Sequence, residues 1–171
     1  MKTENHRVLI IDDERPVLMT VEALLRRRGY QVDAAATALQ GLKLLKSNSP
    51  SLVLLDLQLP DAHGLEMLDQ IKTDLPKAQV IILTAHDSLH NAIESIKRGA
   101  YHFISKPYAP EELLSLVEKA LEKQFLLREA EKLREKTQQL EKRLEIAEAR
   151  QAFCTWANKE NWASKELPAA I

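Results

Sequence analysis

Residues 52–64 read LVLLDLQLPDAHG, and this stretch decides how the rest of the chain is interpreted. Its four leading apolar residues predict a strand buried on both faces, because strands inside a parallel sheet do not alternate apolar with polar side chains. Pro60 and Gly64 then interrupt regular structure. Asp56 is therefore expected at the carboxyl end of a buried strand, where open parallel sheets place their chemistry. An isolated aspartate at such a place also caps turns, so its role depends on its partners.

The same alternation of short apolar runs and helical patterns continues through the first 110 residues. Further strands are predicted at 8–11, 31–35, 80–83 and 102–105. Helices are predicted from Pro16 up to Gly29 and at 38–47, 65–74 and 88–98, with Leu39, Leu42 and Leu45 on one face of the second. Five strand–helix units predict an α/β fold, a parallel sheet with helices on both faces.

Composition limits the classes of protein that fit. The 171 residues allow one ordinary domain and an extension. Lys+Arg 24 against Asp+Glu 25 gives a net charge of -1, which offers no general attraction to nucleic acid or membrane. The single cysteine, Cys154, excludes an internal disulfide framework and indicates a reducing compartment. With no signal-peptide pattern and no membrane-spanning stretch, we expect a cytoplasmic protein.

Chemically useful side chains follow four of the predicted strands: Asp12, Asp13, Asp56, Thr84 and Lys106. Because parallel strands end on one edge of the sheet, these residues are expected to converge. Three carboxylates repel one another unless a cation intervenes, and Mg²⁺ prefers oxygen ligands. In such a pocket Asp56 is a nucleophile for a phosphoryl group, whose oxygens the Lys106 ammonium and the Thr84 hydroxyl can stabilise.

These motifs resemble the receiver domain of two-component response regulators. The resemblance rests on Asp12-Asp13 after the first strand, Asp56 after the third, Thr84-Ala85 after the fourth and Lys106-Pro107 after the fifth, and it covers about residues 7–123. It implies a flavodoxin-like (βα)5 sheet of order 2-1-3-4-5. It also implies a cis bond between Lys106 and Pro107.

The resemblance further implies a role for each site residue. Asp56 is the expected phosphoacceptor for a sensor histidine kinase, assisted by Thr84 and Lys106. Mg²⁺ is expected on Asp12, Asp13, Asp56 and the backbone carbonyl of Gln58. Such a protein assists only its own phosphorylation and dephosphorylation and is not otherwise an enzyme.

The resemblance also implies a switch in which Thr84 moves inward and an aromatic residue, here Phe103, follows. Phenylalanine has no hydroxyl for an outward hydrogen bond, so only the packing part of that switch applies. The alternative is that Phe103 is simply a core residue. His63 and His86 flank the site in loops, and we interpret both as solvated side chains without a catalytic role.

Strong helix formers dominate after Pro110 and predict one long helix to about Ala152. Leucines or alanine recur every seven residues at 126, 133, 140 and 147, and Ala130, Thr137 and Leu144 fill the alternate core position. Opposite charges then pair between neighbouring helices as Glu129 with Arg134, Lys136 with Glu141, and Arg143 with Glu148. A parallel homodimer through residues 126–150 is predicted; a lone solvated helix is the alternative.

The predicted organisation is a receiver domain at 1–123, a coiled-coil signalling helix at 124–152 and a tail at 153–171. The tail, with Phe153, Trp156 and Trp162, is interpreted as the start of an output domain, a docking segment or a disordered end. No basic stripe or helix-turn-helix pattern follows the receiver, so direct DNA binding by this chain is not expected.

Two other functions fit parts of the sequence. A constitutive coiled-coil scaffold with a vestigial acidic pocket would need only the helix. A phosphohydrolase using Asp56 as nucleophile would need a general acid two residues later, as in the haloacid-dehalogenase type, and that position holds Gln58. We therefore favour a phosphorylation-dependent response regulator that relays its state through a dimerising helix.

Overall fold

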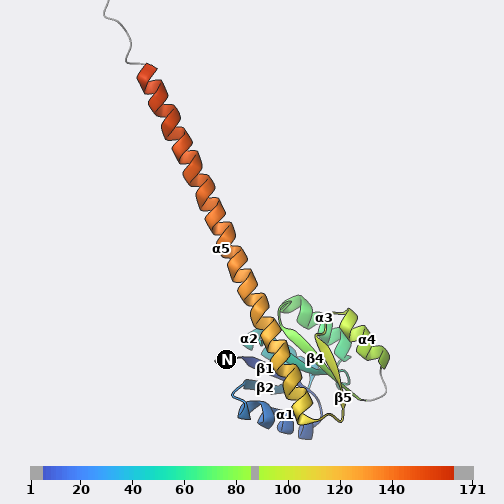
Figure 1. Cartoon of the computed structure of the whole chain (residues 1–171). Helices are drawn as coiled ribbons and strands as arrows, with labels where there is room; N and C mark the ends of the chain where they lie inside the picture. The colour runs from blue at the N-terminus through green and yellow to red at the C-terminus, as the bar shows by residue number, and fades with distance from the viewer. Residues whose placement is uncertain (1–5, 86–88, 164–171) are drawn as a thin grey trace, which may run out of the picture. The chain divides into compact units, whose positions relative to one another are not determined.

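The computed structural model describes residues 6–85 and 89–163, with side chains up to residue 158 except at positions 85 and 89. Five parallel strands form one sheet in the order β2-β1-β3-β4-β5, which confirms the predicted order (Figure 1). The strands are β1 (Arg7–Ile11), β2 (Gln31–Ala35), β3 (Leu52–Asp56), β4 (Gln79–Ala85) and β5 (His102–Lys106).

Five helices connect or follow these strands. They are α1 (Arg15–Arg27), α2 (Ala38–Asn48), α3 (Gly64–Asp74), α4 (Leu89–Lys97) and α5 (Pro110–Ala163). Each agrees in type with the sequence prediction, and the bounds of the first four differ by one or two residues. Pro16 lies in the first turn of α1, where a missing backbone N–H costs nothing. Gly29 and Gly99 follow α1 and α4 with positive φ, which glycine adopts without strain.

Two apolar layers cover the sheet. Residues Val8 and Ile10 of β1 face one layer, to which α1 and the first turns of α5 contribute. Leu9 and Ile11 of the same strand face the other layer, built with α2 and α3. Every residue of β3 is buried, as expected for a central strand covered on both sides. This double cover leaves the carboxyl ends of the strands as the open edge for polar groups.

The orientation of α2 differs from the prediction. Leu39 was expected to share one face with Leu42 and Leu45, but it is 60% exposed, whereas Ala38, Gly41 and Leu45 are buried. The cause is the close approach of Gly41 to β1: a β-carbon at Gly41 would lie 2.6 Å from Cδ1 of Ile11. The helix therefore turns its glycine, rather than its first leucine, toward the sheet.

The chain divides into two compact units, and the division falls within α5, after Arg128. The predicted helix end near Ala152 is wrong, because α5 continues to Ala163. No proline or glycine lies between 153 and 163, so nothing in the local sequence stops the helix. The predicted tail therefore begins as helix, and its residues 164–171 lie outside the described residues. Among the described residues, no helix combines the length and apolar character that crossing a membrane requires.

Candidate functional site

The acidic site lies where β1, β3 and β5 end. Asp12 directly follows β1, and its backbone N–H donates to the Ala35 carbonyl at 3.1 Å, which extends the pairing with β2 by one residue. Asp56 ends β3, and Lys106 ends β5. The structure thus brings together residues that are 94 positions apart in sequence. Carboxylate oxygens of Asp12, Asp13 and Asp56 all lie within 4.8 Å of one another.

The Lys106 ammonium lies in the middle of this group. Its Nζ atom is 2.6 Å from Oδ2 of Asp56 and 2.7 Å from Oδ2 of Asp12. A third carboxylate, that of Glu14, contributes Oε1 at 3.0 Å. The Lys106 side chain is only 15% exposed and the Asp12 side chain is fully buried. Charge-assisted hydrogen bonds of this length in a largely desolvated place hold the ammonium firmly.

The same contacts determine the protonation of the site. Burial by itself lowers the pKa of the Lys106 ammonium, but its hydrogen bonds to Asp12, Asp56 and Glu14 outweigh burial and raise the pKa in net. Burial raises the pKa of the Asp12 carboxyl, against the opposing effect of the hydrogen bonds from Lys106 and the Glu14 backbone. Lys106 is therefore a cation at neutral pH. The site holds one ammonium and four carboxyl groups, those of Asp12, Asp13, Glu14 and Asp56, so acidic groups outnumber basic ones.

The loop after β3 fixes the Asp56 side chain by a backbone hydrogen bond. The Gln58 backbone N–H donates to Oδ1 of Asp56 at 3.0 Å, and the Gly64 N–H closes the loop by donating to the Leu57 carbonyl at 2.9 Å. A β-carbon at Gly64 would collide with the backbone of Leu57 and lie 2.6 Å from the Asp56 carbonyl. Gly64 is therefore required for the tight return of the chain beside Asp56.

Asp61 attaches the same loop to a neighbouring helix. Its two carboxylate oxygens accept hydrogen bonds from the backbone N–H groups of Ala38 and Leu39 at 2.8 and 2.9 Å, at the amino end of α2. These hydrogen bonds, from Leu39 and then Ala38, lower the pKa of the Asp61 carboxyl. Asp61 thus satisfies two N–H groups that the first turn of a helix leaves free.

Thr84 and Phe103, the two residues of the expected switch, lie on the neighbouring strands β4 and β5. Thr84 is buried in β4 and pairs in register with Ser105, one residue before Lys106. Phe103 is half-buried on β5 and packs against the layer that contains α2 and α3. The Lys106–Pro107 bond is cis, as the resemblance implied. The roles predicted for Thr84 and Phe103 remain predictions.

Of the two flanking histidines, the described one, His63, is not a member of the acidic group. His63 is the N-cap of α3, and its Nδ1 atom accepts from the Leu65 backbone N–H at 3.3 Å. His86 lies outside the described residues. The side chain of His63 therefore has a structural use at the end of the loop that begins with Asp56.

Sequence comparison places these residues in a known family. A family model for the response regulator receiver domain matches residues 8–118. The chain belongs to the response regulator receiver family. As a receiver, it resembles the nitrogen assimilation regulatory protein NtrX of Azorhizobium caulinodans, with 37% identity over 135 residues, 78% of this chain and 30% of that protein. It is 35% identical to the alginate biosynthesis transcriptional regulatory protein AlgB of Pseudomonas aeruginosa, over 68% of this chain and 26% of AlgB.

Solved structures agree with this assignment. A CheY-like receiver domain protein from Methanospirillum hungatei superposes with a TM-score of 0.68 and 35% identity, covering 71% of this chain and 97% of that one. NtrX from Brucella abortus in complex with ADP gives a TM-score of 0.73 and 33% identity over 76% of this chain and 30% of NtrX. The receiver chain thus spans less than a third of the length of its NtrX and AlgB relatives.

Two contacts in the receiver site were not predicted from the sequence. One is the ion pair between Glu14 and Lys106, and the other is the capping of α2 by Asp61. Glu14 directly follows the Asp12-Asp13 pair, so its position in the sequence indicated that it could reach Lys106. The second had no local signal, because Asp61 and Ala38 are 23 positions apart.

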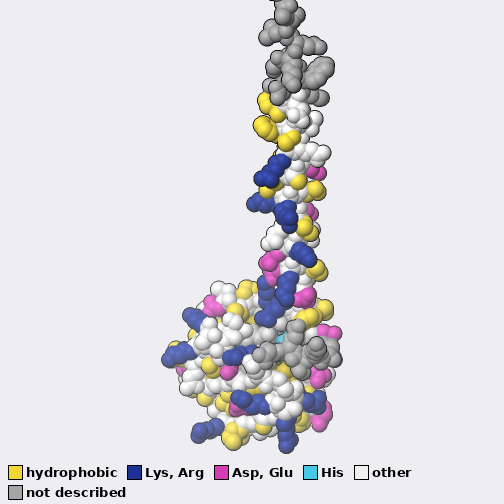
Figure 2. Space-filling view, turned by 90° about the vertical axis from the view of Figure 1, so that its left-hand side faces the viewer, with side chains coloured by type: hydrophobic (Ala, Val, Ile, Leu, Met, Phe, Trp, Pro, Cys, Tyr) yellow, Lys and Arg dark blue, Asp and Glu magenta, His cyan; other side chains and the backbone are white. Residues whose placement is uncertain are grey.

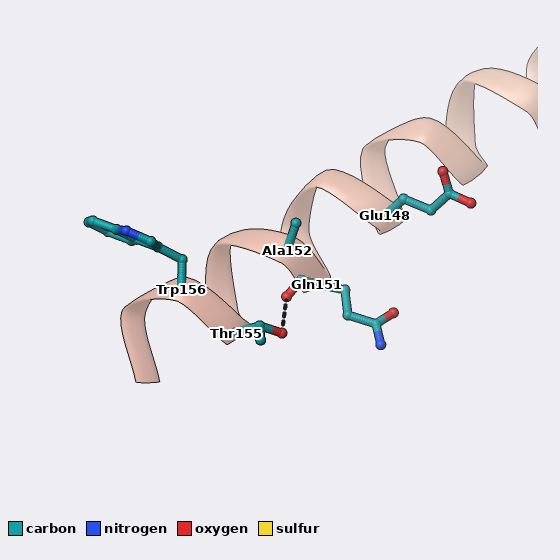
Figure 3. A pocket seen from close by; sticks show the side chains of 5 residues that line it. All are labelled: Glu148, Gln151, Ala152, Thr155 and Trp156. Carbon is teal, nitrogen blue, oxygen red and sulfur yellow. Dashed lines mark hydrogen bonds between the residues drawn. The ribbon is translucent and has the colours of Figure 1, made fainter. Parts of the chain in front are cut away.

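A shallow groove near the end of α5 is not a comparable site. It is lined by Glu148, Gln151, Ala152, Thr155 and Trp156, which all belong to α5. In Figure 3 the Trp156 ring extends from the helix, and the Thr155 hydroxyl donates to the Gln151 carbonyl at 2.9 Å. A surface formed by a single helix cannot enclose a small molecule, so we assign no ligand to it.

Proposed function

We propose that Asp56 accepts a phosphoryl group from the phosphohistidine of a sensor kinase, and that the chain relays this state through a dimer of α5. The observation that carries the first part is the Lys106 ammonium at 2.6 Å from Asp56 within a cluster of carboxylates. An ammonium at that place can stabilise the oxygens of a phosphoryl group bound to Asp56. The membership of the receiver family supports the same reading.

The transfer exchanges one bond to phosphorus for another. An Asp56 carboxylate oxygen forms the new O–P bond while the N–P bond of the phosphohistidine breaks. The electron pair of that bond stays on the imidazole, which takes up a proton from solvent. Lys106 donates a hydrogen bond to a phosphoryl oxygen, and the Thr84 hydroxyl donates to another, so the charge that develops has partners from β4 and β5.

The acidic cluster fits magnesium. Asp12, Asp13 and Asp56 offer hard oxygen donors close enough to share one ion, and the backbone carbonyl of Gln58 would complete the protein ligands. When bound, Mg²⁺ supplies positive charge against the phosphoryl oxygens. Since the site combines one ammonium with four carboxyl groups, it has a surplus of acidic groups whose charge a divalent cation can neutralise.

Intact mass spectrometry tests the phosphoacceptor. We expect the chain to gain the mass of one phosphoryl group when it is incubated with acetyl phosphate and Mg²⁺, and not when EDTA replaces Mg²⁺. The gain should disappear on mild alkaline treatment, because acyl phosphates hydrolyse easily. No gain at any donor concentration would exclude this function and favour the scaffold.

The second part of the proposal rests on the exposed surface of α5. Leu126, Leu133, Leu140 and Leu144 are all exposed, although they are among the most apolar side chains of the chain. In Figure 2 hydrophobic side chains alternate with basic and acidic ones along this helix. The seven-residue spacing and the three complementary charge pairs favour a second copy of α5, in parallel, as the partner.

Cys154 provides a test of that geometry. It falls seven residues after Ala147, at the same heptad position as Leu133 and Leu140, and it is free and exposed. In a parallel dimer in register, the two copies of Cys154 face each other, so mild oxidation should link them. Moving the cysteine to the outer face, with Cys154→Ser and Gln139→Cys together, should abolish the link. Equal linking by both variants would contradict the parallel seam.

A further inference from the structure

The ammonium of Lys106 has three protons, and each has a carboxylate within reach. Asp12, Asp56 and Glu14 lie at 2.7, 2.6 and 3.0 Å from Nζ. The first two belong to the acidic cluster that the proposed function already uses. The third, Glu14, belongs neither to that cluster nor to the phosphoacceptor.

Glu14 is connected to Lys106 by two routes. Its side chain contacts Nζ directly, and its backbone N–H donates to Oδ1 of Asp12 at 2.9 Å, while Oδ2 of the same carboxylate accepts from Lys106. Two side chains of the loop between β1 and α1, those of Asp12 and Glu14, therefore hold the end of the Lys106 side chain, and they are linked to each other. A long, flexible side chain held in this way keeps few of its rotamers.

The local structure at Glu14 gives its side chain no other use. Glu14 is the N-cap residue of α1, but its side chain makes no capping hydrogen bond. Serine, threonine, aspartate and asparagine are the residues that favour this position, because their side chains satisfy a free backbone N–H. At Glu14 the carboxylate instead faces the lysine.

The three carboxylates differ in what phosphorylation does to them. Asp56 changes chemically, since its oxygen forms the bond to phosphorus. Asp12 belongs to the group that would hold a cation. Glu14 takes part in neither event, so its contact with Lys106 is the one that can persist throughout the reaction.

We propose that Glu14 is a positioning residue that holds the Lys106 ammonium beside Asp56 during phosphoryl transfer. This inference rests on the proposed function of Asp56. The Glu14 side chain is 58% exposed, so solvent weakens its contact with Lys106 and the effect of losing it is modest.

The test compares the initial rate of phosphoryl gain from acetyl phosphate, at saturating Mg²⁺, in the wild type and four variants. We expect Glu14→Ala and Glu14→Ser to react about three- to tenfold more slowly, as for loss of one hydrogen bond that solvent weakens. Glu14→Gln keeps an acceptor oxygen and should stay within about twofold of the wild type. Glu122→Gln, an exposed change of the same charge on α5, should not alter the rate.

Glu14→Ser separates positioning from folding. Serine is a better N-cap than glutamate, so this variant should unfold at the same or a higher temperature while reacting more slowly. Wild-type rates in both Glu14→Ser and Glu14→Ala would overturn the inference and leave the phosphoacceptor assignment intact. A loss in Glu14→Gln as large as in Glu14→Ala would also overturn it, because charge rather than the contact would then be responsible. A wild type that gains no phosphoryl group would instead refute the proposed function itself.

Discussion

Leucine side chains are buried in the receiver unit and exposed in the later part of α5. Leu54 in β3 is fully buried, covered by residues of α1, α5 and the neighbouring strands. Leu140 in α5 is 53% exposed. Both are leucines in regular structure, so intrinsic preference does not distinguish them. The receiver packs its apolar side chains against one another within its own chain, whereas the repeating leucines of α5 are exposed.

Polar groups show the same contrast. In the receiver, Lys106 pairs with carboxylates from two other segments, and the Asp12 side chain is fully buried. In the described part of α5 beyond Arg128, the ion pair between Lys132 and Glu129 is local and exposed. Pairs of that kind contribute at most about 0.5 kcal/mol each. Specific chemistry is therefore expected in the first unit and association in the second.

The largest expected effect is a substitution that removes phosphorylation and leaves association unchanged. Asp56→Asn should abolish phosphoryl gain from acetyl phosphate, because the amide cannot act as the nucleophile. Asp69→Asn, at an exposed position of α3, should react like the wild type. Light scattering on unphosphorylated Asp56→Asn should give the mass of the unphosphorylated wild type. A full phosphoryl gain in Asp56→Asn would place the acceptor elsewhere.

The second prediction compares the two leucines directly. Leu54→Ala should lower the free energy of unfolding of the receiver by about 2–5 kcal/mol, since it leaves a cavity in a closed core. Leu140→Ala should leave the receiver transition within about 0.5 kcal/mol of the wild type. Urea unfolding followed by circular dichroism measures both.

Leu140→Ala should instead weaken association, which sedimentation at several concentrations detects. If Leu140→Ala destabilised the receiver as much as Leu54→Ala does, the proposed difference between the buried and the exposed leucine would be wrong. Unchanged association would indicate that α5 does not use this stripe of leucines.

A smaller effect is expected from the charges beside the stripe. Lys136→Glu places like charges next to Glu141 of a second parallel copy and should weaken association by roughly 0.5–1 kcal/mol. Adding Glu141→Lys should restore it. Sedimentation in low and high salt measures both variants, and the difference should shrink in high salt. Failure of the double variant to recover would argue against the parallel pairing.

The smallest effect concerns the pH dependence of the receiver. The folded pKa of Asp61 is lowered from 3.8 by its hydrogen bonds to the Leu39 and Ala38 backbone. The ionised carboxylate therefore stabilises the fold at pH values above the ordinary pKa of aspartate. This contribution disappears as the pH falls through the lower pKa of the folded state. Asp61→Asn should reduce the unfolding temperature slightly at pH 7, and the difference from the wild type should vanish in strong acid.

Asp12 serves as the matched contrast. Burial raises its folded pKa, so its ionised form opposes folding at neutral pH, and this cost declines as the pH falls through the folded pKa. Asp12→Asn should therefore raise the unfolding temperature at pH 7. An equal response of both variants at every pH would show that these two carboxyls do not differ as their contacts suggest.

Much of the receiver follows from local patterns. The fully apolar run before Asp56 predicted a central strand, and the alternation of strands and helices predicted a parallel sheet whose ends meet. The convergence of Asp12, Asp56 and Lys106 followed from that topology, since parallel strands end on one edge. Leu39 escaped the same reasoning, because the orientation of α2 depends on how closely Gly41 approaches Ile11.

The sequence by itself therefore determined the order of the elements, the buried central strand and the edge on which the charged residues gather. These are consequences of hydrophobic periodicity and of chain connectivity, which are local or topological properties. Only the tertiary structure decided that Glu14 is the third partner of Lys106 and that Asp61 caps α2. The position of Glu14 after Asp12-Asp13 indicates only its neighbourhood. Whether a hydrogen bond forms depends on where side chains from distant segments end in space, to within a few tenths of an ångström, and the tertiary structure decides that.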